Sequence, residues 1–142
     1  MKEVVISIRS IHDYGSDGED GLEFTTDGLY SFEDQVGCIS YYESEVTGLM
    51  GTKTKLCIKP DEVIVDRRGS VTSTMVFKKG EKNSFLYNTP YGAATMGIDT
   101  RKIRHDFDEH GGSMEIDYVV DMSHVTATRN RFMIDVRELR HG

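Results

Sequence analysis

Apolar and polar residues alternate along most of this chain with a period of two residues. The alternation is clearest at residues 114–122, where every second residue is apolar or aromatic and acidic residues fill most positions between them. Successive side chains of a strand point to opposite faces of a sheet. The pattern therefore predicts strands with one face turned inward.

We expect about eight to ten strands, because turn residues recur about every 8–12 positions. The expected strands are residues 2–12, 21–33, 37–44, 50–59, 63–67, 71–77, 84–89, 92–104, 114–122 and 125–139. No segment has the 3.6-residue period of a helix. Short connections favour an up-and-down meander, and closing the sheet would remove its edges. The prediction is an all-β fold, one domain over residues 1–142, forming a closed antiparallel barrel.

The expected inward face of the strand at 50–59 is mixed rather than purely apolar. That face carries Met50, Thr52, Thr54, Leu56 and Ile58, and lysines fill the other face. Asn130 falls on the inward face of the last strand. Unpartnered buried hydroxyls and amides cost about 1–3 kcal/mol each. Either the barrel holds water or one small ligand that satisfies Thr52, Thr54 and Asn130, or these groups bond within a filled barrel.

Arg67 shares its phase with two valines, and Glu43 shares the phase of Tyr41 one hairpin earlier. A buried guanidinium needs a partner, and a carboxylate matches its fork of donors. One interpretation makes Arg67 the anchor for a carboxylate or phosphate of a ligand, with Tyr41 or Tyr87 flanking it. The favoured interpretation is a structural Arg67–Glu43 pair at the mouth of the barrel.

Composition narrows the classes of partner. The 142 residues carry a formal charge of −7 with 37% hydrophobic and 29% charged residues, which suits a soluble globular protein and repels nucleic acid. There is no apolar run long enough to span a membrane and no secretory pattern near the start. Cys38 and Cys57 lack metal spacing, so we expect free thiols in the cytoplasm, with a cross-strand disulfide as the alternative.

Segments rich in ligand-type residues do not match known sites. Residues 13–20 fail the calcium-loop pattern, since Gly15 and Phe24 fall at the positions that need ligands. Residues 105–110, HDFDEH, are expected to form a solvated hairpin loop rather than a metal site. No nucleophile motif or phosphate-binding glycine loop occurs. We therefore expect no metal and no cofactor, and the absence of such motifs favours a protein that is not an enzyme.

A set of short motifs in a fixed order nonetheless resembles one bacterial family. The motifs are Tyr42-Glu43, Gly48, Gly51-Thr52-Lys53-Thr54, Arg67-Arg68-Gly69, Tyr87-Asn88-Thr89-Pro90-Tyr91-Gly92, Thr100, Gly112 and Tyr118. In this order they resemble the YwiB-like family of DUF1934 type, and the likeness covers nearly the whole chain. It implies a calycin-like barrel, similar to lipocalins and fatty-acid-binding proteins. It carries over no catalytic residue and implies no specific function.

Three functions compete at this point. The leading hypothesis is a cytoplasmic monomer or homodimer that binds a small, partly polar or amphipathic ligand in its lumen. The second is an interaction or homo-oligomeric module with a filled barrel, using a surface such as the stripe of Arg129, Arg131 and Arg137. The third is an enzyme that uses Glu43, Arg67 and a tyrosine on a small acyl or sugar-like substrate.

Overall fold

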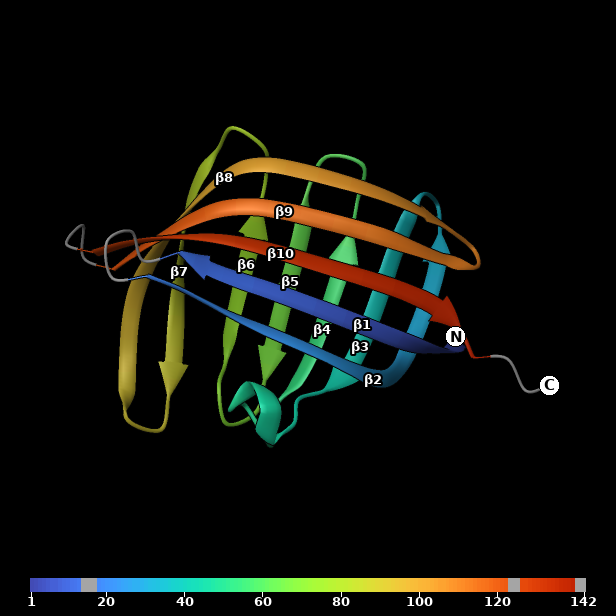
Figure 1. The fold of residues 1–142 in the computed structure, drawn as a ribbon, viewed down its shortest axis with the longest axis horizontal. Helices are drawn as coiled ribbons and strands as arrows, with labels where there is room; N and C mark the ends of the chain where they lie inside the picture. Colours follow the sequence, from blue (N-terminus) through green and yellow to red (C-terminus); the bar gives the residue numbers. More distant parts are fainter. Residues whose placement is uncertain (14–17, 123–125, 140–142) are drawn as a thin grey trace.

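A computed structural model describes residues 1–13, 18–122 and 126–139, and Figure 1 shows the strands of these residues as one rolled sheet. Within them the sheet has ten strands, all antiparallel to their neighbours. They are β1 (Lys2–Asp13), β2 (Glu19–Glu33), β3 (Val36–Tyr42), β4 (Lys53–Ile58), β5 (Val63–Arg68), β6 (Ser73–Phe77), β7 (Lys82–Thr89), β8 (Gly92–Asp108), β9 (Gly111–Met122) and β10 (Thr126–Glu138).

The strand order confirms the predicted meander. It runs β6-β5-β4-β3-β2-β1-β10-β9-β8-β7, so every strand pairs with a sequence neighbour and the first strand pairs with the last. β6 and β7 are the two ends of this order. They meet where Thr72 and Asn88 exchange backbone hydrogen bonds of 2.9 and 3.0 Å. The side chain of Asn83 in β7 adds a bond of 3.3 Å to the carbonyl of Val76 in β6. The sheet therefore forms a nearly closed barrel.

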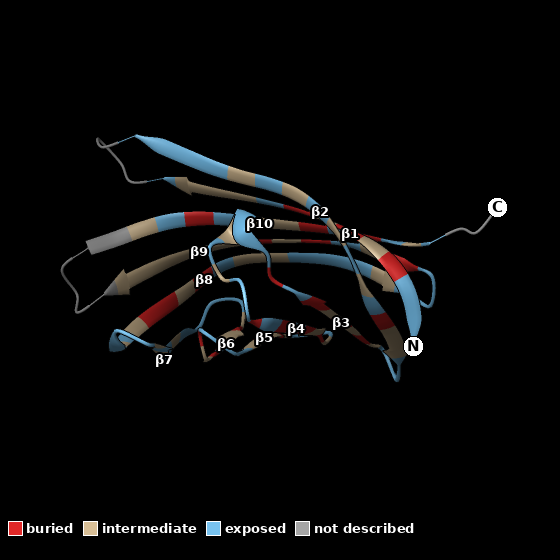
Figure 2. Ribbon diagram, turned by 90° about the horizontal axis from the view of Figure 1, so that it is seen from below, coloured by how far each residue is buried: buried red, intermediate tan, exposed pale blue. Residues whose placement is uncertain are grey.

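Two layers cross at a steep angle, with β1, β8, β9 and β10 in front of β3 to β6 (Figure 1) and apart from them in the view of Figure 2. β2 belongs to both layers: it pairs with β1 from Glu19 to Tyr30 and with β3 from Leu29 to Glu33. The change falls at Gly28, where a Cβ atom would lie 2.5 Å from the carbonyl oxygen of Ser40. β8 has its irregularity between Thr100 and Lys102. These positions form the corners between the layers.

The core lies between the two layers, and the inward phases match the alternation in the sequence. Its fully buried side chains include Ile6 of β1, Tyr30 of β2, Ile39 of β3, Ile98 of β8 and Ile134 of β10. The tyrosine hydroxyl donates a hydrogen bond of 2.5 Å to the carbonyl of Asp108. Burial, and then the charge of Asp108, raise the pKa of Tyr30 to about 12. The side chains buried between the layers are thus mainly apolar.

The connection from β3 to β4 differs from the sequence-based prediction. A 3-10 helix, η2 (Glu45–Thr47), occupies it, capped by the side chain of Ser44 and ended by Gly48 in the left-handed conformation. β4 consequently starts at Lys53, and Met50 is 60% exposed instead of facing inward. Such a single helical turn is too short to produce a periodic signal in the sequence.

β8 is longer than predicted, since it continues to Asp108. Only Glu109 and His110 of the expected 105–110 loop form the turn. None of the helices in the described parts of the chain has the length and hydropathy needed to cross a membrane.

The prediction of free thiols is wrong, because Cys38 and Cys57 form a disulfide. The two residues lie directly opposite each other in β3 and β4, with 4.2 Å between their Cα atoms. That register brings both sulfurs to the outer face of the sheet. Their separation of 19 residues along the chain had left the register, and hence the pairing, undetermined.

Candidate functional site

A row of polar side chains crosses four neighbouring strands of the rear layer. Tyr41 of β3, Thr54 of β4, Arg67 of β5 and Ser73 of β6 occupy directly opposed register positions. All four side chains are on the inward face of their strands. Their row is two residues along each strand from the apolar row that contains Ile39. The row lies at the end of β3 from which the chain enters η2 (Figure 1).

Glu43 lies on the same inward face, two residues beyond Tyr41 along the chain, and is only 7% exposed. Its backbone N–H donates to the carbonyl of Thr52 at 2.8 Å, which continues the ladder past the end of β3. Its side chain leans back over the row, so that Oε1 accepts a hydrogen bond of 2.6 Å from the hydroxyl of Thr54. The other oxygen, Oε2, is buried and has no hydrogen-bond partner among the described residues. A buried carboxylate therefore keeps an unused acceptor.

Arg67 does not pair with Glu43, and the favoured sequence-based interpretation is wrong on this point. No nitrogen of Arg67 lies within 4.0 Å of an oxygen of Glu43, because the carboxylate is held by Thr54. Arg67 Nη1 donates to the sulfur of Met75 at 3.4 Å, a weak acceptor. Arg67 Nε is buried and lacks a partner in the described chain. The guanidinium edge that contains Nε is therefore available to an oxyanion.

Tyr41 lies in the electric field of both charged groups. Burial, then the charge of Glu43 and a side-chain hydrogen bond to that carboxylate, raise the pKa of Tyr41 well above its usual value, while Arg67 and the hydroxyl of Thr54 act in the opposite direction. Burial likewise raises the pKa of Tyr118 in β9, and Arg67 again lowers it. Arg67 is thus close enough to affect tyrosines of both layers. Both phenols stay protonated and can donate hydrogen bonds at neutral pH.

The front layer carries a second polar row, formed by Thr100, Tyr118, Asn130 and His12 in consecutive register. Asn130 Nδ2 donates to the carbonyl of Thr128 at 2.9 Å, so Asn130 Oδ1 faces His12 Nδ1, 2.5 Å away. In the neutral imidazole the proton is then on Nδ1 and the lone pair on Nε2. Thr100 is fully buried, and its hydroxyl is unpartnered within the described residues.

The structure brings the side chains of four predicted site residues together, places a fifth, Thr52, opposite Glu43 with its hydroxyl engaged elsewhere, and separates the other two. Tyr41, Glu43, Thr54 and Arg67 form one group. The hydroxyl of Thr52 accepts from the backbone N–H of Val71 at 3.3 Å and lies 2.8 Å from the hydroxyl of Ser70, so it closes the β5–β6 turn. Asn130 belongs to the front layer with His12. Tyr87 lies in β7, where it packs against the apolar core.

The sequence-based site omitted Ser73, Thr100 and Tyr118. Each follows the inward alternation of its strand, so the phase was a usable signal for them. Ser73 is 3% exposed and its hydroxyl, like that of Thr100, has no partner in the described parts of the chain. What the alternation could not supply is the lateral register that places Ser73 beside Arg67.

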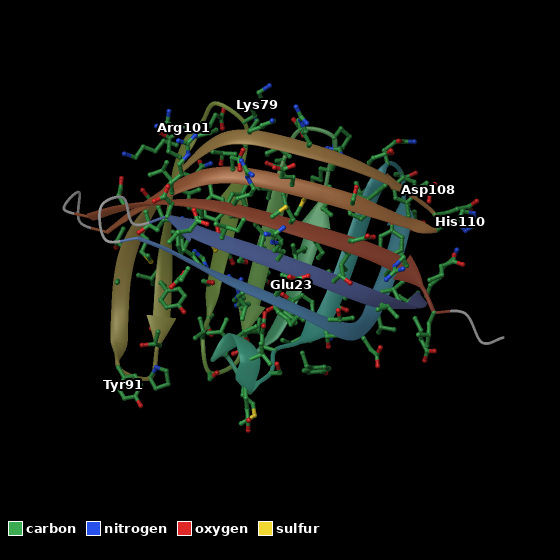
Figure 3. The ribbon with its side chains drawn as sticks, viewed as in Figure 1. Glu23, Lys79, Tyr91, Arg101, Asp108 and His110 are labelled. Carbon is green, nitrogen blue, oxygen red and sulfur yellow. A yellow bond between two sulfur atoms is a disulfide. The ribbon has the colours of Figure 1, made fainter. Side chains whose placement is uncertain are left out.

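The other candidates from the sequence, residues 105–110 and the arginine stripe, form ordinary contacts at the surface. Within the described residues no three side chains of metal-ligating type gather, and His110 bonds to Glu138 at 3.1 Å, at the far end of the molecule from Tyr91 (Figure 3). Arg131 of the basic stripe pairs with Asp117 at 3.0 Å and Glu115 at 3.4 Å. These acidic partners hold the pKa of Arg131 above its usual value.

A hollow of about 470 Å³ lies on the outer face of the front layer. Its lining includes Arg9, Glu23, Arg104 and Met133, which belong to one register row, and Glu23 is marked in Figure 3. None of its lining residues belongs to the group of Tyr41, Glu43, Thr54 and Arg67.

The comparisons with known proteins agree with this architecture. A family model described as "Domain of unknown function (DUF1934)" matches residues 6–134. The chain is 29% identical over 116 residues to the "Uncharacterized beta-barrel protein YwiB" of Bacillus subtilis (strain 168), covering 81% of this chain and 79% of that protein. The crystal structure of the ywiB protein from Bacillus subtilis superposes with a TM-score of 0.85 at 24% identity, over 98% of this chain and 93% of that one. This protein is therefore a β-barrel that belongs to the DUF1934 family.

Proposed function

We propose that the protein binds a small, partly polar or amphipathic ligand inside the barrel, at the polar end. By the polar end we mean the group formed by Tyr41, Glu43, Thr54, Arg67 and Ser73. The observation that carries the proposal is that Glu43 and Arg67, two inward groups of opposite charge, do not contact each other. Each also keeps a buried polar atom without a partner in the described chain.

The free-energy cost of leaving buried polar atoms without partners supports a bound ligand at this group. An unsatisfied buried donor or acceptor costs about 1–3 kcal/mol, and more when the group is charged. Folded proteins contain few such atoms, and each needs an explanation such as a bound molecule or a catalytic role. Here Glu43, Arg67 and Ser73 present them within one group. A ligand that bonds to these atoms would offset that cost, and its apolar part would lie against the neighbouring core.

A thermal-shift screen of small polar and amphipathic metabolites tests the proposal. We expect a compound that raises the melting temperature of the wild type but not that of Arg67→Met. Arg9→Met is the matched control, since Arg9 is an exposed arginine on the outer face, and it should keep the full shift. Circular dichroism would verify that each variant is folded. Equal shifts in wild type and Arg67→Met, or no shift with any compound, would contradict the proposal.

We propose that this function operates in the cytoplasm, although both cysteines of the chain are joined in a disulfide. The Cys38–Cys57 bond would meet a reducing environment there. Both sulfurs lie on the outer face of the sheet and the polar end lies on its inner face, so reduction should leave binding unchanged. A ligand-induced shift that disappears on adding a thiol reductant would argue against this location.

A second candidate, an interaction or homo-oligomeric module, is supported by apolar side chains exposed around η2. Tyr42, Val46 and Met50 are 72%, 55% and 60% exposed. Exposed apolar side chains that lie close together mark interfaces more often than isolated ones do. Sedimentation of the wild type and of the double variant Val46→Ser/Met50→Ser would separate the candidates. If the wild type is an oligomer and the double variant is a monomer, this function is supported. If both proteins are monomers, this function is excluded.

A further inference from the structure

Arg67 presents its free edge to the interior in a way that selects one kind of ligand group. Nη1 is turned to Met75, which leaves Nε and the adjacent Nη2 as a pair of parallel donors. This side of a guanidinium matches two oxygens of a carboxylate. Tyr118 from the opposite layer lies within the field of the same guanidinium. One end of the ligand therefore carries an anionic group.

Glu43 selects a different group beside it. Its Oε1 is occupied by the hydroxyl of Thr54, so Oε2 is the acceptor that remains for a ligand. An ionised carboxylate accepts hydrogen bonds but donates none. At 7% exposure its unpaired charge favours a cationic donor over a neutral one. A second ligand group, next to the anionic one, should be an ammonium.

From these two requirements we propose that the ligand is a small zwitterion of the free amino acid type. Its carboxylate binds the Nε edge of Arg67 and its ammonium binds Oε2 of Glu43. The proposal rests on the binding function proposed above, and deepens it by naming the chemical class. It also explains why the two residues are held apart: the ligand needs an opposite charge at each end, and a direct Arg67–Glu43 pair would consume both.

The charge of the whole chain supports a zwitterion over a simple anion. At a formal charge of −7 the protein repels anions, whereas a ligand without net charge is not repelled. A simple carboxylate would bond to Arg67, but it would bring a second negative charge close to Glu43 and leave Glu43 without a partner. A simple amine would satisfy Glu43 and leave Arg67 unpaired. A hydroxy acid meets both hydrogen-bonding requirements but leaves the charge of Glu43 uncompensated.

The test is a thermal-shift and calorimetric series with matched probes. Each standard amino acid is added singly at about 10 mM, a concentration that stabilises the folded state when the dissociation constant is well below it. For any amino acid that raises the melting temperature, its 2-hydroxy analogue, its deaminated acid and its decarboxylated amine follow. We expect the amino acid to bind at least about tenfold more tightly than all three.

The variants assign each end of the ligand separately. Glu43→Gln should weaken binding of the amino acid by about tenfold or more and barely change binding of the deaminated acid. Arg67→Met should abolish binding of both, and Arg9→Met should change neither. If no amino acid binds while another metabolite binds in an Arg67-dependent way, the class is wrong and the binding function stands. If the three analogues bind as well as the amino acid, the zwitterion is also excluded.

Discussion

Neutralising Glu43 and Arg67 together should make the protein more stable while removing ligand binding. The perturbation is the double variant Glu43→Gln/Arg67→Met. Glutamine keeps an oxygen for the hydroxyl of Thr54, which now donates to Oε1 at 2.6 Å. Methionine keeps a straight side chain next to Met75 and carries no charge. The double variant thus removes both buried charges with little change in shape.

The expected magnitude follows from the two unpartnered atoms. Glu43 Oε2 and Arg67 Nε each carry a desolvation cost of about 1–3 kcal/mol that no partner in the described chain offsets. Replacing buried charges with uncharged groups of similar volume is often neutral or stabilises by about 1–4 kcal/mol. The glutamine amide retains part of the cost, so we expect the free energy of unfolding to rise by about 1–3 kcal/mol.

Urea unfolding followed by far-UV circular dichroism at pH 7 would measure the change, with equal slopes required of both proteins. The control is Asp99→Asn/Arg101→Met, which removes a contacting surface pair of 3.0 Å and should lower stability by no more than about 1 kcal/mol. A loss of more than about 2 kcal/mol in the Glu43/Arg67 double variant would contradict this prediction, because it would mean that the two charges hold the barrel together.

Four further outcomes are expected. Tyr30→Phe should flatten the fall in stability above pH 10: the unfolded chain releases this proton near pH 10 and the folded chain near pH 12, so stability present below pH 10 is lost as the pH rises through 12. Replacing Cys38 and Cys57 by serine should lower the free energy of unfolding by about 3 kcal/mol, since the bond closes a loop of 19 residues. Gly28→Ala should cost about 1–3 kcal/mol, as its Cβ would lie 2.5 Å from a backbone oxygen of β3. Thr54→Val should cost about 1.5–3 kcal/mol by removing the hydrogen bond to the buried carboxylate.

Each of these outcomes has a control or a contrary result. An unchanged pH profile in Tyr30→Phe would show that this phenol is not protected by burial. A reductant should lower the stability of the wild type but not of the double serine variant, and equal effects would contradict the assignment of the disulfide. Thr25→Ala, an exposed change on β2, should be near neutral beside Gly28→Ala. A neutral Thr54→Val would mean that the carboxylate finds another donor.

Alternation in the sequence was enough to predict the fold, because the inward face of each strand is read from its own residues. The phases of Ile6, Ile39, Ile98 and Ile134 all agree with their burial. Short connections then limited the topology to a meander. Gly28 lies where β2 passes from one layer to the other, and a glycine inside a strand is typical of such a bend.

The site was harder to predict, because it depends on distances between strands rather than on phase within one. Phase placed Arg67 and Glu43 on the inner face, but a direct pair and a separated pair have the same sequence pattern. The hydrogen bond from Thr54 decides between them, and it requires the lateral register of β3 and β4. The disulfide was missed for the same reason. Ser73 was overlooked because a lone serine in a strand carries little signal.

A crystal structure of the protein with the compound that raises its melting temperature most would show whether the ligand occupies the polar end. We expect density for that compound there, with an oxyanion on Arg67 Nε and a donor on Glu43 Oε2. This expectation would be contradicted by a structure in which ordered water alone occupies both atoms, or in which Arg67 and Glu43 bond directly to each other, while the compound is bound elsewhere.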